Sequence, residues 1–263
     1  MIAQNTIIAL QDSYTTPVDR KRSMLPPTMA FYTRMLGVVF KSAHRAKRGR
    51  YGDAEWVNSS IDIFNGLEAA GCNFDIRGMG VLSRLAGPVV FVANHMSTLE
   101  TFVLPSLINP VCPCTFVIKP SLMDYPVFGH VMRSRHPIVV SRDNPRQDLV
   151  MVMEQGAERI KNGTSVILFP QTTRTQHFDH TTFNSLGVKL ARSAGVPVLP
   201  IALKTDAWDN GRLFKDFGRI RPHRRVHIHF GEQLSVEGNG REQHERVVAF
   251  VQHLLEQWQM ETS

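Results

Sequence analysis

From residue 73 onward, short apolar segments alternate with longer stretches whose apolar residues recur at helical spacing. Alternation of this kind is typical of strand–helix–strand units, in which successive strands pair in parallel. The predicted strands are residues 73–79, 89–94, 114–119, 137–141, 164–169, 196–203 and 226–230. The predicted helices are residues 98–107, 121–132, 145–161, 184–193 and 241–260. The pattern predicts an α/β fold, with a layered, largely parallel sheet flanked by helices.

The first 70 residues have a different character. Residues 1–27 show no periodicity and contain three prolines, so we expect an irregular arm there. Two stretches with helical spacing follow, at about residues 29–48 and 54–70. We therefore divide the chain into residues 1–70, an N-terminal arm with basic amphipathic helices, and residues 71–263, an α/β domain.

The net charge of +7 is a property of the N-terminal segment. Residues 1–50 hold nine Lys and Arg and two acidic residues, whereas the remaining residues hold 21 of each sign. Basic residues beside a Phe, Met and Leu face are typical of a helix that lies on an anionic membrane surface. The alternative is an ordinary amphipathic helix packed on the core. No companion motif indicates nucleic acid, so we expect no nucleic-acid partner.

Three cysteines are too few for a disulfide framework, which favours a reducing compartment. The first residues lack the basic-then-apolar order of a signal peptide, and no apolar run approaches the ~18–20 residues of a spanning helix. We therefore expect a peripheral protein on the cytoplasmic face of a membrane, without a spanning helix. The histidines and cysteines do not have the spacing of zinc ligands, so we expect no metal site.

A histidine lies at the predicted turn between the strand at 89–94 and the helix at 98–107, with a carboxylate five residues later. In one interpretation Ser97 caps the helix and Glu100 completes a capping box. In the other, Glu100 orients His95 as a general base. We expect the carboxylate to do only one of these jobs at a time.

Four successive predicted strands end at a side chain that can carry positive charge: His95, Lys119, Arg142 and Arg174. Ligands of open α/β sheets bind at the carboxyl ends of the strands, so we expect these side chains to converge there. Arginine matches phosphate geometry, and neighbouring threonine hydroxyls donate hydrogen bonds alongside it. The strand ends therefore predict an anion-binding site with a potential base.

These residues resemble the motifs of the glycerolipid acyltransferases, the 1-acylglycerol-3-phosphate acyltransferase group. Asn94-His95-x4-Glu100 resembles the motif N-H-x4-D/E, and Val139-Val140-Ser141-Arg142 resembles the second motif. Phe169-Pro170-Gln171-Thr172-Thr173-Arg174-Thr175 resembles F-P-E-G-T-R-S, and Val196-Pro197-Val198-Leu199-Pro200 resembles V-P-V/I-x-P. The motifs occur in family order over about residues 70–235. The resemblance therefore implies that residues 71–263 form an acyltransferase domain.

The resemblance implies that His95 is the general base and that Glu100 orients it. It implies a substrate-binding set of Asn94, Lys119, Arg142, Gln171, Thr172, Thr173 and Arg174. Gln171-Thr172 departs from the usual Glu-Gly of the family, and this change bears on the identity of the acceptor rather than on the reaction type.

The implied reaction is transfer of an acyl chain from an acyl thioester, on coenzyme A or acyl carrier protein, to the free hydroxyl of a lysophospholipid. The expected acceptor is 1-acyl-sn-glycerol-3-phosphate, and no cofactor is expected. No Gly-x-Ser-x-Gly elbow occurs in the sequence, which favours direct transfer without an acyl-serine. Three alternatives stay open: a different lysolipid acceptor, an acyl thioester hydrolase, and a lipid-binding protein without catalytic activity.

Overall fold

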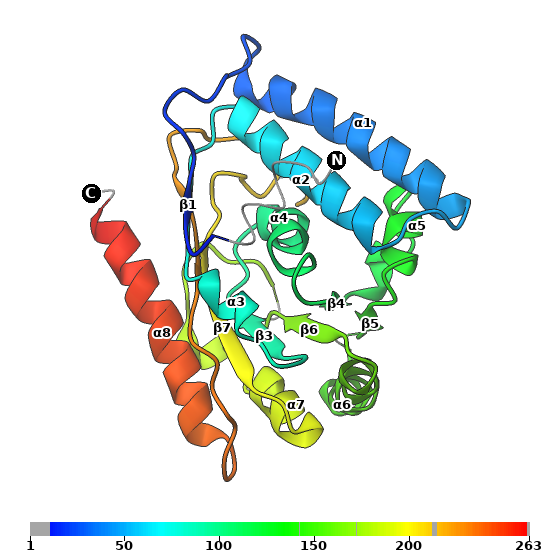
Figure 1. Cartoon of the computed structure of the whole chain (residues 1–263), viewed down its shortest axis with the longest axis vertical. Coiled ribbons are helices and arrows are strands. Elements are labelled where there is room, and N and C mark those ends of the chain that lie inside the picture. Colours follow the sequence, from blue (N-terminus) through cyan, green and yellow to red (C-terminus); the bar gives the residue numbers. More distant parts are fainter. Residues whose placement is uncertain (1–10, 142, 172, 212–214, 262–263) are drawn as a thin grey trace.

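An eight-stranded sheet forms the centre of the computed structural model, which describes residues 11–141, 143–171, 173–211 and 215–261 (Figure 1). The strand order is β1-β2-β8-β7-β3-β6-β4-β5. The strands are β1 (Tyr14–Thr15), β2 (Phe74–Arg77), β3 (Val90–Ala93), β4 (Cys114–Ile118), β5 (Ile138–Val139), β6 (Ser165–Leu168), β7 (Val198–Lys204) and β8 (Val226–Phe230). Neighbouring strands are parallel except in the β1–β2 and β7–β8 pairs. The predicted α/β class and the largely parallel sheet are confirmed.

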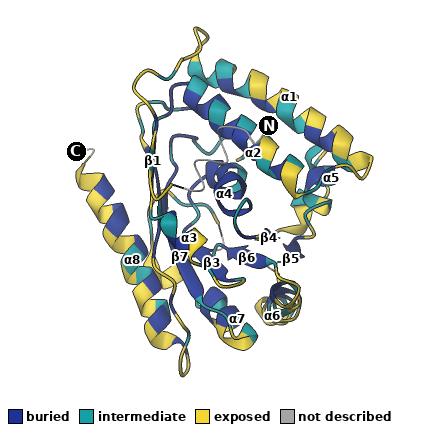
Figure 2. Ribbon diagram, viewed as in Figure 1, coloured by how far each residue is buried: buried dark blue, intermediate teal, exposed yellow. Residues whose placement is uncertain are grey.

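Helices cover both faces of the sheet, which gives three layers (Figure 1). One layer contains α1 (Pro27–Lys47), α2 (Asp53–Ala69), α3 (Gly80–Ser83), α4 (Leu99–Ile108) and α5 (Phe128–Arg133). The other contains α6 (Pro145–Lys161), α7 (Leu186–Ala194) and α8 (Arg241–Met260). Strand β3 shows why helices cover both faces, since its side chains are apolar on each side of the sheet. Phe91 and Ala93 pack into the first layer, and Val90 and Val92 pack into the second. A strand that is buried on both faces reads as a continuous apolar run, as this one does (Figure 2).

The N-terminal segment joins the body of the molecule. Strand β1 extends the sheet edge by pairing with β2, so the arm that we expected to be irregular contains an edge strand. Two residues carry no periodicity, which is why the sequence did not reveal it. Phe31 of α1 is fully buried and its ring lies edge-on to Trp208, with ring centroids 4.7 Å apart. The predicted boundary between residues 70 and 71 stays a prediction.

Helix α1 has a buried face and an exposed one. Its exposed face carries two stripes, one apolar (Met29, Leu36 and Phe40) and one basic (Arg34, Lys41 and Arg45, continued by Arg48 at the C-terminal cap). Among the described residues, no helix combines the length and the apolar character needed to cross a membrane.

The helix predicted over residues 121–132 is wrong. The chain instead forms a 3₁₀ turn at Pro120–Leu122 and then the short helix α5. Pro126 explains the break, because proline lacks a backbone N–H and disfavours helical geometry in the residue before it. Val127 follows with a φ of 67°, which is unusual for a β-branched residue.

Strands β3, β4, β5, β6 and β7 run in the same direction, so their carboxyl ends meet at one edge of the sheet. The turn after β3 lies at this edge, in the middle of the sheet, between the turns that follow β6 and β7. The fold thus places the segments that carry the predicted site residues next to each other.

Candidate active site

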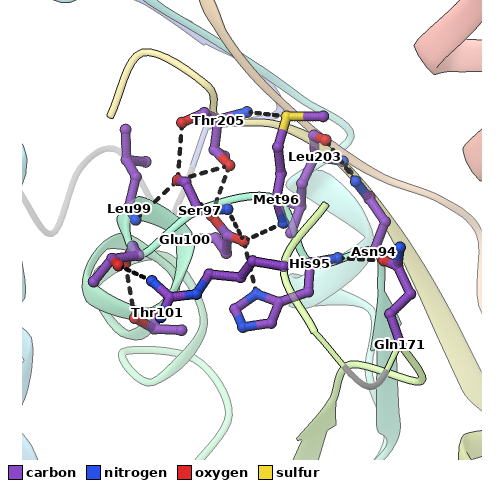
Figure 3. Close-up of polar contacts among 12 residues, drawn as sticks. Asn94, His95, Met96, Ser97, Leu99, Glu100, Thr101, Gln171, Leu203 and Thr205 are labelled. Carbon is purple, nitrogen blue, oxygen red and sulfur yellow. Dashed lines mark hydrogen bonds and ion pairs between the residues drawn. The ribbon is translucent and has the colours of Figure 1, made fainter. Parts of the chain in front are cut away.

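His95 and Glu100 form a hydrogen-bonded pair at the start of α4 (Figure 3). His95 Nδ1 lies 2.9 Å from Glu100 Oε1. The imidazole ring also stacks on Phe169, with ring centroids 4.3 Å apart and planes at 14°. The side chain is 14% exposed, which leaves one edge of the ring open. The ring is therefore fixed by a carboxylate at Nδ1 and by an aromatic face.

Glu100 is fully buried and accepts hydrogen bonds at both of its oxygens (Figure 3). Oε1 accepts from His95 Nδ1 and from the backbone N–H groups of Met96 at 2.7 Å and Ser97 at 2.9 Å. Oε2 lies 3.0 Å from Ser97 Oγ and accepts from Thr205 Oγ1 at 2.6 Å. Glu100 thus bonds to His95 and to the backbone N–H of Ser97 at the same time, so the two contacts that we treated as alternatives do not exclude each other.

These contacts also lower the pKa of Glu100. Burial by itself raises the pKa of this carboxyl, but the hydrogen bonds and charge of His95, with the hydrogen bonds from Thr205 and Ser97, outweigh it and lower the pKa. A carboxylate that accepts from Nδ1 selects the imidazole tautomer with its proton on Nδ1. Nε2 is then the nitrogen with a free lone pair, as a general base requires.

The backbone around His95 is held by side chains that the sequence assigned to substrate. Gln171 is buried, and its Oε1 accepts from the backbone N–H of His95 at 2.7 Å while its Nε2 donates to Thr175 Oγ1 at 3.1 Å. Asn94 is also buried and exchanges two hydrogen bonds of 2.8 Å with the backbone of Leu203 in β7. Among the described residues, neither side chain lines the cavity described next, and both hold the backbone of the turn that carries His95.

A cavity of about 560 Å³ opens beside His95. This volume falls within the range of small-molecule sites, about 300–1,000 Å³. Its polar lining includes His95, Thr98, Lys119, Thr173 and Arg174. Most of its remaining wall is apolar, and more than half of these apolar residues come from α1, β4 and α5. The cavity therefore joins a potential base to cationic side chains and to space for a hydrocarbon chain.

Arg174 reaches the cavity with its guanidinium group already engaged. One terminal nitrogen, NH1, donates to Thr98 Oγ1, and the other, NH2, lies 2.6 Å from Asp216 Oδ1. Asp216 Oδ2 accepts from the hydroxyl of Tyr125 at 2.6 Å. Burial by itself raises the pKa of Asp216, but the Tyr125 hydroxyl and the Arg174 charge outweigh it and lower the pKa. The predicted anion site thus contains a carboxylate of the chain itself.

Two of the predicted substrate residues, Arg142 and Thr172, lie outside the described residues. The structure brings His95, Lys119, Thr173 and Arg174 to one cavity. It places Glu100 directly behind His95. These positions fit the roles that the motifs imply, and the roles themselves stay predictions.

Comparison with known proteins agrees with the motifs. A family model described as Acyltransferase matches residues 73–204, half of the chain. A 1-acyl-sn-glycerol-3-phosphate acyltransferase of Pseudomonas aeruginosa is 31% identical over 193 residues, which cover 73% of this chain and 70% of that protein. The chain belongs to the acyltransferase family. The family resemblance read from the motifs is confirmed, and the protein is an enzyme of the acyltransferase class.

Two further relatives of this acyltransferase bear on its fold and its acceptor. The crystal structure of the 1-acyl-sn-glycerophosphate acyltransferase PlsC from Thermotoga maritima superposes with a TM-score of 0.64 over 89% of this chain and 95% of that chain, at 20% identity. A lyso-ornithine lipid O-acyltransferase of Pseudomonas aeruginosa is 28% identical over 130 residues, about half of each protein. The first supports the fold, and the second shows that similar relatives differ in the lipid they are named for.

Several residues of this acyltransferase site were missed from the sequence. Asp216 and Thr205 lie more than 100 residues after the histidine motif and belong to no motif. Tyr125 lies in the segment that was wrongly predicted as helix. Phe169 was assigned only as part of a motif, although its ring stacks on His95. Only the topology brings these side chains to His95 and Arg174, so local sequence carried no signal for them.

Proposed function

We propose that this acyltransferase transfers an acyl chain from an acyl thioester to the free hydroxyl of a lysophospholipid. The favoured acceptor is 1-acyl-sn-glycerol-3-phosphate, and the product is then phosphatidic acid. The observation that carries the proposal is the cavity, in which His95, bonded to Glu100, faces an apolar space beside Arg174 and Lys119. The Pseudomonas aeruginosa relative that is 31% identical over 73% of this chain is named for the same acceptor.

In the proposed mechanism, His95 acts as the general base. A glycerol hydroxyl is a weak nucleophile near neutral pH, so a base positioned at its proton accelerates attack by about 10²–10⁴-fold. Nε2 takes the proton as the oxygen attacks the thioester carbonyl, and Glu100 stabilises the resulting imidazolium. When the carbon–sulfur bond breaks, the imidazolium returns the proton to the departing thiolate. An ester and a free thiol are formed, and His95 is neutral again.

The cationic side of the cavity is where we place the acceptor's head group. Arg174 presents a planar donor fork and Lys119 a point charge, and both groups bind phosphate. Thr173 adds a hydroxyl at the same wall. The acyl thioester is a substrate that is consumed in the reaction, and we propose no cofactor beside it.

The apolar wall is where we place an acyl chain. Leu36, Phe40 and Phe217 line the cavity and are also 46%, 57% and 49% exposed, so they form an apolar rim at its mouth. Leu36 and Phe40 belong to the exposed apolar stripe of α1. An apolar rim beside a basic helix fits a mouth that opens toward a lipid surface.

The test of the function is an acceptor panel. Purified protein is supplied with palmitoyl-coenzyme A or palmitoyl acyl carrier protein and with lysophosphatidic acid, lyso-ornithine lipid or lysophosphatidylethanolamine, and the products are identified by mass spectrometry. Phosphatidic acid is the expected main product. Palmitic acid without acylated lipid would indicate a hydrolase instead, and lipid binding without turnover of any acceptor would indicate a protein without catalytic activity.

We further propose that the exposed basic stripe of α1 binds anionic membranes at the cytoplasmic face. Changing Lys41, Arg45 and Arg48 together to glutamine is expected to weaken binding to phosphatidylglycerol vesicles by about 100-fold, since each charge near an anionic surface contributes about 1 kcal/mol. Cosedimentation at low salt measures the loss, and raising the salt is expected to weaken binding of the unchanged protein.

Point changes serve this test better than removal of the N-terminal segment. A deletion of residues 1–50 would also remove strand β1 and the buried Phe31, so it would disrupt the core. A matched control changes three exposed basic residues of the other layer to glutamine: Lys161 of α6 and Lys189 and Arg192 of α7. Equal binding by both triple variants and no salt effect would mean that α1 is packed on the core without a membrane role.

A further inference from the structure

Arg174 and Asp216 form an ion pair in the wall of the cavity, at the place where the acceptor's phosphate is proposed to bind. The two charged groups are 2.6 Å apart, and the side chains are 17% and 24% exposed. Both line the cavity beside His95. The pair is therefore partly shielded from water and faces the substrate space.

Asp216 is held in this position by neutral groups as well. Tyr125 donates to Oδ2 at 2.6 Å, and Thr98 Oγ1 lies 3.3 Å from Oδ1. Thr98 also accepts from Arg174, so the guanidinium keeps one anchor that does not depend on Asp216. The arrangement allows the carboxylate to be separated from the arginine while each retains a partner.

Carboxylate and phosphate bind the same guanidinium N–H groups. A phosphate that approaches Arg174 therefore meets a carboxylate on the donors it needs, and the two anions repel each other. Arg221 and Arg224 pair with Asp209 in the same part of the chain, but none of these three side chains lines the cavity. Among the described residues that line the cavity, Asp216 is the carboxylate that could compete with a phosphate for Arg174.

We propose that Asp216 is an internal counter-ion of Arg174, which the acceptor's phosphate displaces on binding and which returns to the arginine as the phosphorylated product leaves. The inference rests on the proposed function, because it takes Arg174 as the phosphate ligand. Asp216 thereby raises the KM for an anionic acceptor and shortens the residence of an anionic product. Its effect scales with the negative charge of the lipid head group, which distinguishes it from a residue that merely orients Arg174.

The decisive variant is Asp216→Asn, which keeps an acceptor for the Tyr125 hydroxyl and removes the charge. KM is measured at pH 8 for three acceptors: lysophosphatidic acid, which is then a dianion, lysophosphatidylglycerol, a monoanion, and uncharged monoacylglycerol. We expect KM to fall by about tenfold for the dianion, by about threefold for the monoanion and not at all for the neutral lipid. The inhibition constant of added phosphatidic acid is expected to fall by the same factor as the KM for lysophosphatidic acid.

Asp209→Asn is the matched control, because it removes a carboxylate paired with arginine outside the cavity and is expected to leave all three KM values unchanged. A rise in KM, or an equal change for all three acceptors, would overturn the inference and leave Asp216 as a structural support of Arg174. If the asparagine variant folds poorly, Asp216→Ala replaces it in the same KM measurements. The thermal midpoints of the variant and the unchanged protein show whether the variant is folded.

A direct binding measurement separates this inference from the proposed function. The affinity for sn-glycerol 3-phosphate is compared between the unchanged protein and Asp216→Asn by calorimetry, with sn-glycerol as the uncharged probe. Tighter binding of the phosphate alone by the variant supports the counter-ion, whether or not any lipid is acylated. If no acceptor on the panel is turned over but this shift is seen, the proposed function fails and the counter-ion stands; without the shift, the counter-ion is rejected.

Discussion

Replacing His95 with alanine is expected to lower kcat for acyl transfer by about three orders of magnitude, because the acceptor hydroxyl then loses its general base. The fold should persist. The His95 side chain makes one hydrogen bond and one ring contact, whereas the backbone of the turn is held through Gln171 and Glu100. Initial rates with a palmitoyl thioester and lysophosphatidic acid give kcat, and thermal unfolding monitored by circular dichroism tests the fold.

Two further variants sharpen this experiment. His95→Gln keeps a side chain that can hydrogen-bond to Glu100 but lacks a base, so it should be as inactive as the alanine variant. His229→Ala removes a half-buried histidine on β8, outside the cavity, and should retain normal kcat. If His95→Ala has the same kcat as the unchanged protein, His95 is not the base. Another group in the cavity would then have to take the proton.

The layers of the fold were predictable because its signals are local. Strand β8 and helices α6 and α8 have the bounds that the apolar periodicity predicts. The parallel arrangement followed from the alternation of strands and helices, and it correctly placed His95 and Arg174 at the same edge of the sheet. Where local signals conflict, as at Pro126 within an otherwise helical pattern, the prediction failed.

The candidate site was predictable where it depends on chain order, and not where it depends on contacts across the sheet. Motif spacing placed Glu100 near His95, which the turn geometry bears out at 2.9 Å. Asn94 and Gln171 occupy motif positions, but the Asn94 side chain bonds to the backbone of Leu203, and the Gln171 side chain bonds to the backbone N–H of His95 and the Thr175 hydroxyl. Whether a polar side chain at a strand end turns toward a ligand or toward the chain depends on its neighbours in three dimensions.

The substitution of glutamine for the usual glutamate at position 171 now has a physical explanation. Its Oε1 accepts from the backbone N–H of His95, as a carboxylate oxygen also could, so the catalytic turn keeps this support. Its Nε2 donates to Thr175, which a carboxylate cannot do. The change also removes a negative charge from the turn after β6. Asp216 is the carboxylate among the described residues that line the cavity, and position 171 lies outside that lining.

The second large effect is expected at Glu100. Glu100→Gln keeps the size of the side chain and an oxygen that can accept from His95 Nδ1 and from the backbone of the turn, so the thermal midpoint should change little. It removes the charge that stabilises the imidazolium as the hydroxyl attacks. We expect kcat to fall by about three orders of magnitude, as for His95→Ala, because Glu100 acts through His95, while KM for the acceptor stays within about twofold.

This prediction attributes the loss of kcat to the position of the Glu100 carboxylate beside His95, and not to its burial. Glu68 is the matched control, since it is equally buried, accepts from Tyr14 and Thr16 at 2.7 Å each and forms an ion pair with Arg20 at 2.9 Å, yet it has these partners in place of His95. Glu68→Gln should cost stability and leave kcat unchanged. Glu100→Ala should lower both kcat and the stability of the fold. It leaves the buried N–H groups of the turn without an acceptor, which costs about 1–3 kcal/mol of folding free energy for each group. A Glu100→Gln enzyme with normal kcat would show that Glu100 only caps helix α4, and that His95 needs no charged partner.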